Sequence, residues 1–233
     1  PFESLRSGDG SSAWLAGGSG EGSSRAAVCL CHGRSRSKAW LRPLIGALAP
    51  EYAVLAFDFP GHGENPYGWT TVGRREADTV DHALELLAAR GYTRVLLYGC
   101  SMGGAAALLS QGRHPHPSVQ GLVTDGTFAA FPEVLEHRAG WVPAYLRLGA
   151  LCVAGMLAGY DPWAVRPIDS VAGVAVPVLL LHGDEDHLVP PDTALRMAGQ
   201  SPRANAQLYH GRHDEPANAE MQAAVRAFAA DVL

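Results

Sequence analysis

Short runs of consecutive apolar residues recur along this 233-residue chain, separated by segments with helical spacing. The runs lie at residues 26–31, 52–57, 95–98 and 176–181, and further strands are expected at 120–124 and 206–209. A strand that is apolar at successive positions is typical of a sheet covered on both faces. Strands alternating with helices therefore predict an α/β fold, with helices on both faces of a mostly parallel central sheet.

The expected helices cover residues 41–48, 71–90, 102–111, 191–199 and 216–232. The segment 71–90 has the clearest pattern, because its apolar residues recur at the i, i+3, i+4 and i+7 positions of one face. These residues are Val80, Ala83, Leu84 and Leu87. Near the N-terminus, residues 8–24 are rich in Gly and Ser, and their Asp9-Gly10 pair predicts a hairpin at the sheet edge.

Composition narrows the class of protein further. Hydrophobic residues make up 47% of the chain and charged residues 18%, which indicates a buried core rather than disorder. The formal net charge is 18 − 23 = −5, and the chain has no long Lys/Arg block that could follow a phosphate backbone. Nucleic acid is therefore not an expected partner.

Cysteine spacing argues against a disulfide framework and against a metal site. Cys29 and Cys31 lie two apart in an expected strand and point to the same face, where a bridge would be strained. No second Cys pair and no suitably spaced His pair completes a metal site. We expect Cys29, Cys31, Cys100 and Cys152 to be buried thiols.

No secretory signal is recognisable at the given N-terminus. The longest apolar stretch, residues 141–160, is interrupted by Pro143, Arg147 and several glycines. We expect it to form a buried or lid helix rather than a membrane span. A cytoplasmic location is expected.

The sequence Gly-Cys-Ser-Met-Gly at residues 99–103 lies between an expected strand and an expected helix. This G-x-S-x-G pattern in this context predicts a sharp turn that exposes the hydroxyl of Ser101. The alternative is a phosphate-binding turn, which is weakened because no Lys-Ser or Lys-Thr pair follows the glycines. The backbone N–H of Met102 is an expected donor to an oxyanion.

A serine nucleophile needs a base, and the base needs an acid that orients it. Residues 179–182 run into the acidic segment 183–186, and residues 208–210 run into the segment 211–214, which contains a second histidine. Asp184 and Asp186 are candidates for the acid, and His210 and His213 for the base; Asp125 is an acid only in a variant arrangement. His32, His62 and His187 are expected to support loops.

Five segments resemble blocks of the α/β-hydrolase superfamily, in the same order, over residues 28–214. They read LCHGRS, FDFPGHGEN, YGCSMGG, VPVLLLHGDEDHLVP and HGRHDE. The resemblance is closest to the serine-aminopeptidase-like and lysophospholipase-like branch. It implies that Asp186 is the acid, that His213 is the base, and that the backbone N–H of Arg34 is the second oxyanion donor.

The resemblance also implies one domain over residues 1–233 with a short helical cap inserted at about 128–168. The expected activity is hydrolysis of a small carboxylic ester or thioester through an acyl-enzyme, without metal or cofactor. An amidase or aminopeptidase, an acyltransferase or perhydrolase, and a non-catalytic ligand-binding protein are the alternatives. Phe128, Trp141 and Tyr145 are the expected substrate-binding residues; Phe131, Leu146 and Met156 are also available to line the pocket.

The basic stretch 34–38 follows the first of these blocks. If Arg34, Arg36 and Lys38 lie at the mouth of the site, they favour acidic or phosphate-bearing substrates. The alternative is a solvated loop with no role in selection.

Overall fold

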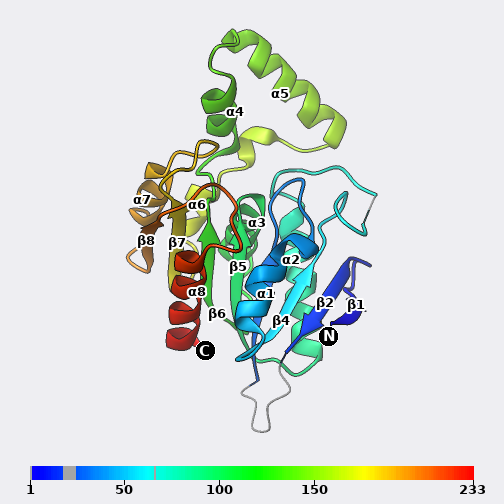
Figure 1. Ribbon diagram of the computed structural model, residues 1–233. Helices are drawn as coiled ribbons and strands as arrows, with labels where there is room; N and C mark the ends of the chain where they lie inside the picture. The colour runs from blue at the N-terminus through cyan, green and yellow to red at the C-terminus, as the bar shows by residue number, and fades with distance from the viewer. Residues whose placement is uncertain (1, 18–24, 66) are drawn as a thin grey trace.

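Within residues 2–17, 25–65 and 67–233, which the computed structural model describes, eight strands form one sheet in the order β1-β2-β4-β3-β5-β6-β7-β8 (Figure 1). The strands are β1 (Glu3–Arg6), β2 (Ser12–Ala16), β3 (Ala26–Cys31), β4 (Ala53–Phe57), β5 (Arg94–Cys100), β6 (Val119–Asp125), β7 (Val178–Gly183) and β8 (Ala204–Tyr209). The edge hairpin β1-β2 is antiparallel, β2 pairs antiparallel with β4, and all other pairs are parallel. The predicted α/β class and mostly parallel sheet are confirmed; residues 18–24 of the predicted hairpin segment lie outside the described residues.

Helices cover both faces of this sheet. They are α1 (Arg42–Leu48), α2 (Glu76–Ala89), α3 (Met102–Arg113), α4 (Phe131–Ala139), α5 (Ala144–Ala158), α6 (Pro167–Val171), α7 (Asp192–Ala198) and α8 (Ala219–Val232), with 3-10 turns η1 (Lys38–Leu41) and η2 (Pro162–Ala164). Residues of α2, α3, α6 and α7 share one core cluster, and residues of α1 and α8 share the other. Along β3, Cys29 belongs to the first cluster and its neighbours Val28 and Leu30 to the second, so successive side chains fill opposite cores.

Helix α2 begins five residues later than predicted, at Glu76. The preceding Val72 and Gly73 have φ angles of 55° and 114°, which a right-handed helix does not allow. The buried carboxylate of Glu76 accepts hydrogen bonds from the backbone N–H groups of Thr71 and Gly73 and from the Thr71 hydroxyl. This carboxylate supplies an acceptor for backbone N–H groups that precede the helix.

The segment between β6 and β7 carries α4, α5, η2 and α6, and α4 and α5 stand away from the sheet (Figure 1). Helix α5 is not the buried helix that we considered for residues 141–160. Its large apolar side chains are mostly exposed, including Tyr145, Leu146, Leu148, Val153, Met156 and Leu157. Cys152 on α5 is exposed too, so the prediction of four buried thiols is wrong at this residue and right for the other three. Within the described residues, no helix has the length and hydropathy needed to cross a membrane.

Glycine at 103 allows α3 to approach β3 closely. A Cβ at Gly103 would lie 2.3 Å from the carbonyl oxygen of Cys31, whereas a Cβ at Gly46 in α1 would meet nothing within 4 Å. We expect Gly103→Ala to lower the free energy of unfolding by about 2–3 kcal/mol, because backbone must move. Gly46→Ala should raise it by about 0.5–1 kcal/mol through helix propensity. Urea unfolding of the two variants checks this, and equal effects would contradict it.

Candidate active site

Ser101 stands on the turn between β5 and α3. Its φ of 49° and ψ of −113° are rare for a residue with a side chain and cost on the order of 1–3 kcal/mol. Two hydrogen bonds hold the turn: the Ser101 N–H donates to the Asp125 carbonyl at 2.8 Å, and the Thr127 hydroxyl donates to the Ser101 carbonyl at 3.2 Å. The surrounding contacts thus maintain an unfavourable backbone conformation that exposes the hydroxyl.

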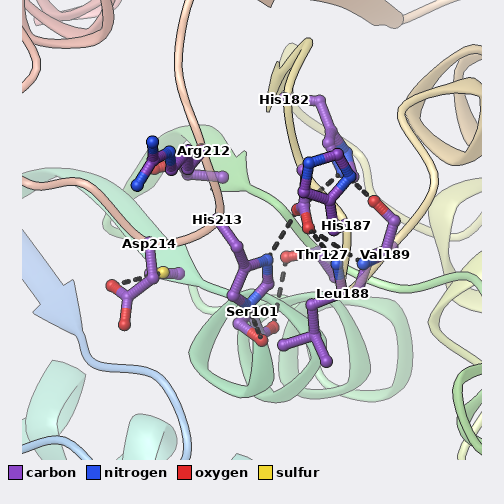
Figure 2. Close-up of polar contacts among 12 residues, drawn as sticks. Ser101, Thr127, His182, His187, Leu188, Val189, Arg212, His213 and Asp214 are labelled. Atoms are coloured by element: carbon purple, nitrogen blue, oxygen red, sulfur yellow. Dashed lines mark hydrogen bonds and ion pairs between the residues drawn. The ribbon is translucent and has the colours of Figure 1, made fainter. Parts of the chain in front are cut away.

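The side chains of Ser101, His213 and Asp186 are brought together from three separate strand ends. Nε2 of His213 lies 3.0 Å from Oγ of Ser101, and Nδ1 of His213 lies 2.6 Å from Oδ2 of Asp186. Figure 2 shows the ring of His213 directed at Ser101. Asp186 follows β7 and His213 follows β8, so the carboxyl ends of parallel strands supply the cluster.

The carboxylate of Asp186 is fully buried and accepts several hydrogen bonds. Its Oδ1 accepts from the backbone N–H groups of Leu188 and Val189 at 2.8 and 2.9 Å. Its Oδ2 faces both Nδ1 of His213 and Nε2 of His182, the latter at 3.1 Å. Burial alone would raise the pKa of Asp186, but the hydrogen bonds from the two histidines outweigh it and hold the pKa well below its usual range. Asp186 is therefore ionised and keeps the Nδ1 proton of His213 directed toward it.

Ser101 and His213 open onto a cavity of about 510 Å³. Its walls are mainly apolar and include Val72, Met102, Phe128, Phe131, Val134, Leu135, Leu188 and Val189. Its charged lining residues are Arg34, Arg36, Arg138 and Asp214, and His213 lines it as well. A pocket of this size and polarity suits a small, partly apolar molecule.

The loop after β3 passes directly beside Ser101. A Cβ at Gly33 would lie 3.5 Å from the Cβ of Ser101. Nδ1 of the buried His32 donates to the Gly33 carbonyl at 2.7 Å, while Nε2 accepts from the N–H of Phe59 at 3.1 Å. Burial lowers the pKa of His32 to about 4, so its ring is neutral at pH 7. Because a trans peptide directs its C=O and N–H oppositely, this bond turns the Arg34 N–H away from His32.

A family model described as the alpha/beta hydrolase fold matches residues 26–151, which is more than half of the chain. The chain belongs to this α/β-hydrolase family. Among curated proteins it is similar to the uncharacterized protein YqkD of Bacillus subtilis, with 29% identity over 171 residues, covering 69% of this chain and 55% of that protein. It is also similar to a pimeloyl-[acyl-carrier protein] methyl ester esterase of Neisseria meningitidis, with 28% identity over 113 residues, covering 48% of this chain and 41% of that protein.

Solved structures show the same fold. An esterase of Pyrococcus furiosus superposes with a TM-score of 0.76 at 20% identity, over 100% of this chain and 90% of the other. A monoacylglycerol lipase of Paleococcus ferrophilus gives a TM-score of 0.74 at 20% identity, over 96% of this chain and 99% of the other. This chain spans about half the length of the curated relatives that it matches first.

Asp184 and His210, the other candidates for the acid and the base, form a pair with each other rather than with Ser101. His210 and Asp184 lie 3.3 Å apart and are largely exposed. Asp125 is buried and accepts hydrogen bonds from the hydroxyls of Tyr98 and Tyr209 at 3.1 and 2.8 Å. Its side chain therefore links the end of β6 to β5 and β8 near the turn at Ser101.

The basic stretch is only partly at the pocket. Lys38 is buried and its Nζ bonds Asp58 at 2.5 Å and Glu64 at 2.8 Å, so its expected place at the mouth is wrong. Arg36 lines the pocket, but its Nε donates to Asp214 at 2.8 Å. Arg34 lines the pocket and is exposed.

The expected pocket residues divide into two groups. Phe128 and Phe131 line the pocket, as anticipated. Trp141 and Tyr145 do not, because they are 87% and 73% exposed on the α4–α5 segment; Leu146 and Met156 are exposed as well. The sequence reasoning missed His182 beside Asp186 and the helical stripe on α4. Phe131, Val134, Leu135 and Arg138 recur at i, i+3, i+4 and i+7, a spacing that was available as a signal.

The protonation of Asp125 yields a pH-dependent stability. Burial raises its pKa to about 6, against hydrogen bonds from Tyr209 and Tyr98 that lower it. Because the unfolded state loses this proton near pH 4 and the folded state near pH 6, stability falls as pH rises through that window, by about 3 kcal/mol.

Asparagine at this position stays neutral, so Asp125→Asn should gain stability relative to the parent between pH 4 and pH 7. Urea unfolding across this range measures the difference between the two proteins. The exposed Asp184→Asn is the control that removes one carboxylate elsewhere. A difference between Asp125→Asn and the parent that does not vary with pH would show that Asp125 is ionised throughout.

Proposed function

We propose that this chain is a serine hydrolase that cleaves a carboxylic ester or thioester through an acyl-enzyme intermediate. The observation that carries the proposal is a chain of two hydrogen bonds beside a cavity. The first joins Ser101 Oγ to His213 Nε2 at 3.0 Å, and the second joins His213 Nδ1 to Asp186 Oδ2 at 2.6 Å. A base within hydrogen-bond distance activates a serine hydroxyl, and a buried carboxylate holds the base in the required tautomer.

In the first half of the reaction, Nε2 of His213 accepts the proton of Ser101 as Oγ attacks the carbonyl carbon. Asp186 stabilises the imidazolium that forms. His213 then gives its proton to the leaving alcohol or thiol, which departs and leaves the acyl group on Ser101. In the second half, His213 removes a proton from water, and the resulting attack releases the carboxylic acid and regenerates Ser101.

The negative charge on the carbonyl oxygen is stabilised by the backbone N–H groups of Met102 and Arg34. Met102 begins α3, where N–H groups lack partners within the helix and the helix dipole is positive. The bond from His32 to the Gly33 carbonyl supports the required orientation of the Arg34 peptide. One such donor contributes about 3 kcal/mol of transition-state stabilisation.

Esters and thioesters are favoured over amides because their leaving groups depart more easily. The names of the Neisseria meningitidis and Pyrococcus furiosus relatives, both esterases, support the same choice. We regard residues 1–233 as one domain with a cap at about 128–168, since α4 contributes to the pocket wall while α5 stands outside it.

Replacing the nucleophile should abolish turnover. We expect Ser101→Ala to lower kcat for 4-nitrophenyl butyrate by roughly 10⁴–10⁶-fold and to prevent labelling by a fluorophosphonate probe. Ser4→Ala on the exposed edge strand β1 is the control and should match the parent. A parent protein that neither labels nor turns over the ester would refute the proposed function, and a labelled protein that transfers acyl groups to alcohol faster than to water would indicate an acyltransferase.

The two neighbouring aspartates should differ sharply. We expect Asp186→Asn to lower kcat by about 10³–10⁴-fold with little change in KM, because the amide favours the wrong tautomer of His213. Asp184→Asn should keep most of the activity, since Asp184 pairs with His210 at the surface. Steady-state kinetics of the two variants test the assignment, and the reverse order of effects would transfer the acid role to Asp184.

A further inference from the structure

The charges that line the pocket do not balance. Its lining contains three arginines and one carboxylate, besides His213. Arg36 is already paired with that carboxylate, Asp214, at 2.8 Å, and its guanidinium stacks on Trp40 at 4.0 Å from the ring centre. Within the described residues, Arg34 and Arg138 make no ion pair within 4.0 Å, and both are exposed. The pocket therefore carries two cations without a counter-ion.

Nearby carboxylates are engaged elsewhere. Glu133 on α4 forms two hydrogen bonds with Arg196, and Glu136 lies 4.0 Å from Arg147. Glu76, near the pocket residue Val72, is buried and bonded to its own preceding loop. Neither Arg34 nor Arg138 is neutralised by these groups, so an anion in the pocket would meet free guanidinium donors.

The two arginines flank an apolar surface. Arg34 follows Gly33, the residue that packs beside Ser101. On α4, Phe131 packs against the core, and Arg138 lies seven residues further along the same stripe. Seven residues of helix correspond to a rise of about 10 Å, and Val134 and Leu135 occupy that interval. From Phe131 outward along α4, a bound molecule would thus contact the apolar side chains of Val134 and Leu135 and then the guanidinium of Arg138.

We propose that the pocket selects esters that carry a carboxylate or phosphate group, with Arg34 and Arg138 as the residues that discriminate them from neutral esters. This inference rests on the proposed function and names its substrate class. Guanidinium groups bind carboxylate and phosphate oxygens through paired, charge-assisted hydrogen bonds. The apolar part of the ester packs along Phe131, Val134 and Leu135. Because both arginines are exposed, water and salt screen each contribution, which limits it to a moderate factor.

The experiment compares two matched pairs of esters. In the first pair the charge is on the acyl side: 4-nitrophenyl hydrogen adipate against 4-nitrophenyl hexanoate. In the second it is on the alcohol side: 1-hexanoylglycerol 3-phosphate against 1-hexanoylglycerol. We expect the parent to prefer the anionic member of at least one pair by about tenfold or more in kcat/KM, and the pair with the larger preference identifies the source of the charge.

Arg138→Gln and Arg34→Gln should each reduce this preference by about three- to tenfold, and the double variant should reduce it further. Glutamine at 34 keeps the backbone N–H, so the variant tests the side chain alone. Arg203→Gln is the matched control, because Arg203 is exposed directly before β8 and does not line the pocket. It should leave the preference unchanged, whereas raising the salt concentration should weaken the preference of the parent.

The outcomes separate this inference from the proposed function. If the parent hydrolyses neutral and anionic esters equally, or if Arg203→Gln lowers the preference as much as the pocket variants, the inference is overturned while the hydrolase remains. A protein whose Ser101 labels but which hydrolyses none of the four esters also overturns it. Absence of both labelling and hydrolysis refutes the proposed function itself.

Discussion

The contact between the start of α3 and the end of β3 is the constraint on which the site depends. Gly103 lets α3 approach the Cys31 carbonyl so closely that no side chain fits between them. The strained turn at Ser101 directly precedes this contact, and Gly33, in the loop after β3, packs beside Ser101. Ser101, the helix N-terminus and the neighbouring loop thus lie around one packing contact, and hydrogen bonds with Asp125 and Thr127 offset the strain of Ser101.

Buried polar groups hold the loops that surround this turn. Asp186 anchors the loop after β7 through the N–H groups of Leu188 and Val189, and its second oxygen is left to two histidines. Asp214 connects the loop of His213 with the loop after β3, because it accepts from both Arg36 and Trp40. Each of these carboxylates binds donors from segments distant in the chain, so the loops are positioned by charge-assisted bonds rather than by apolar packing alone.

Features that depend on an apolar pattern or a short motif were predictable from the sequence, and features that depend on contacts of particular polar side chains were not. The strands and the turn at Ser101 follow from apolar runs and a short motif, whereas the choice of Asp186 and His213 came from the resemblance of two later segments to a known family. The late start of α2 depends on Glu76 reaching back to Thr71, and the burial of Lys38 depends on Asp58, 20 residues away. Aromatic content alone could not place Trp141 and Tyr145, because they are exposed on the α4–α5 segment, which stands away from the sheet (Figure 1).

The two pocket cations that are unpaired within the described residues come from different parts of the chain, the basic segment 34–38 and α4. In the segment 34–38, Lys38 forms a buried ion pair with Asp58, and Arg36 forms an ion pair with Asp214. Arg34 is the remaining cation of this segment. Arg138 on α4 supplies a second cation to the pocket. The sequence predicted that this segment belongs to the cap but did not predict which of its side chains face the pocket. Two free guanidinium groups on an apolar wall cost little in water, since each remains exposed, but they penalise a neutral ligand that displaces their hydration without replacing it. The proposed selection against neutral esters thus draws on the same exposure that makes each single ion pair weak.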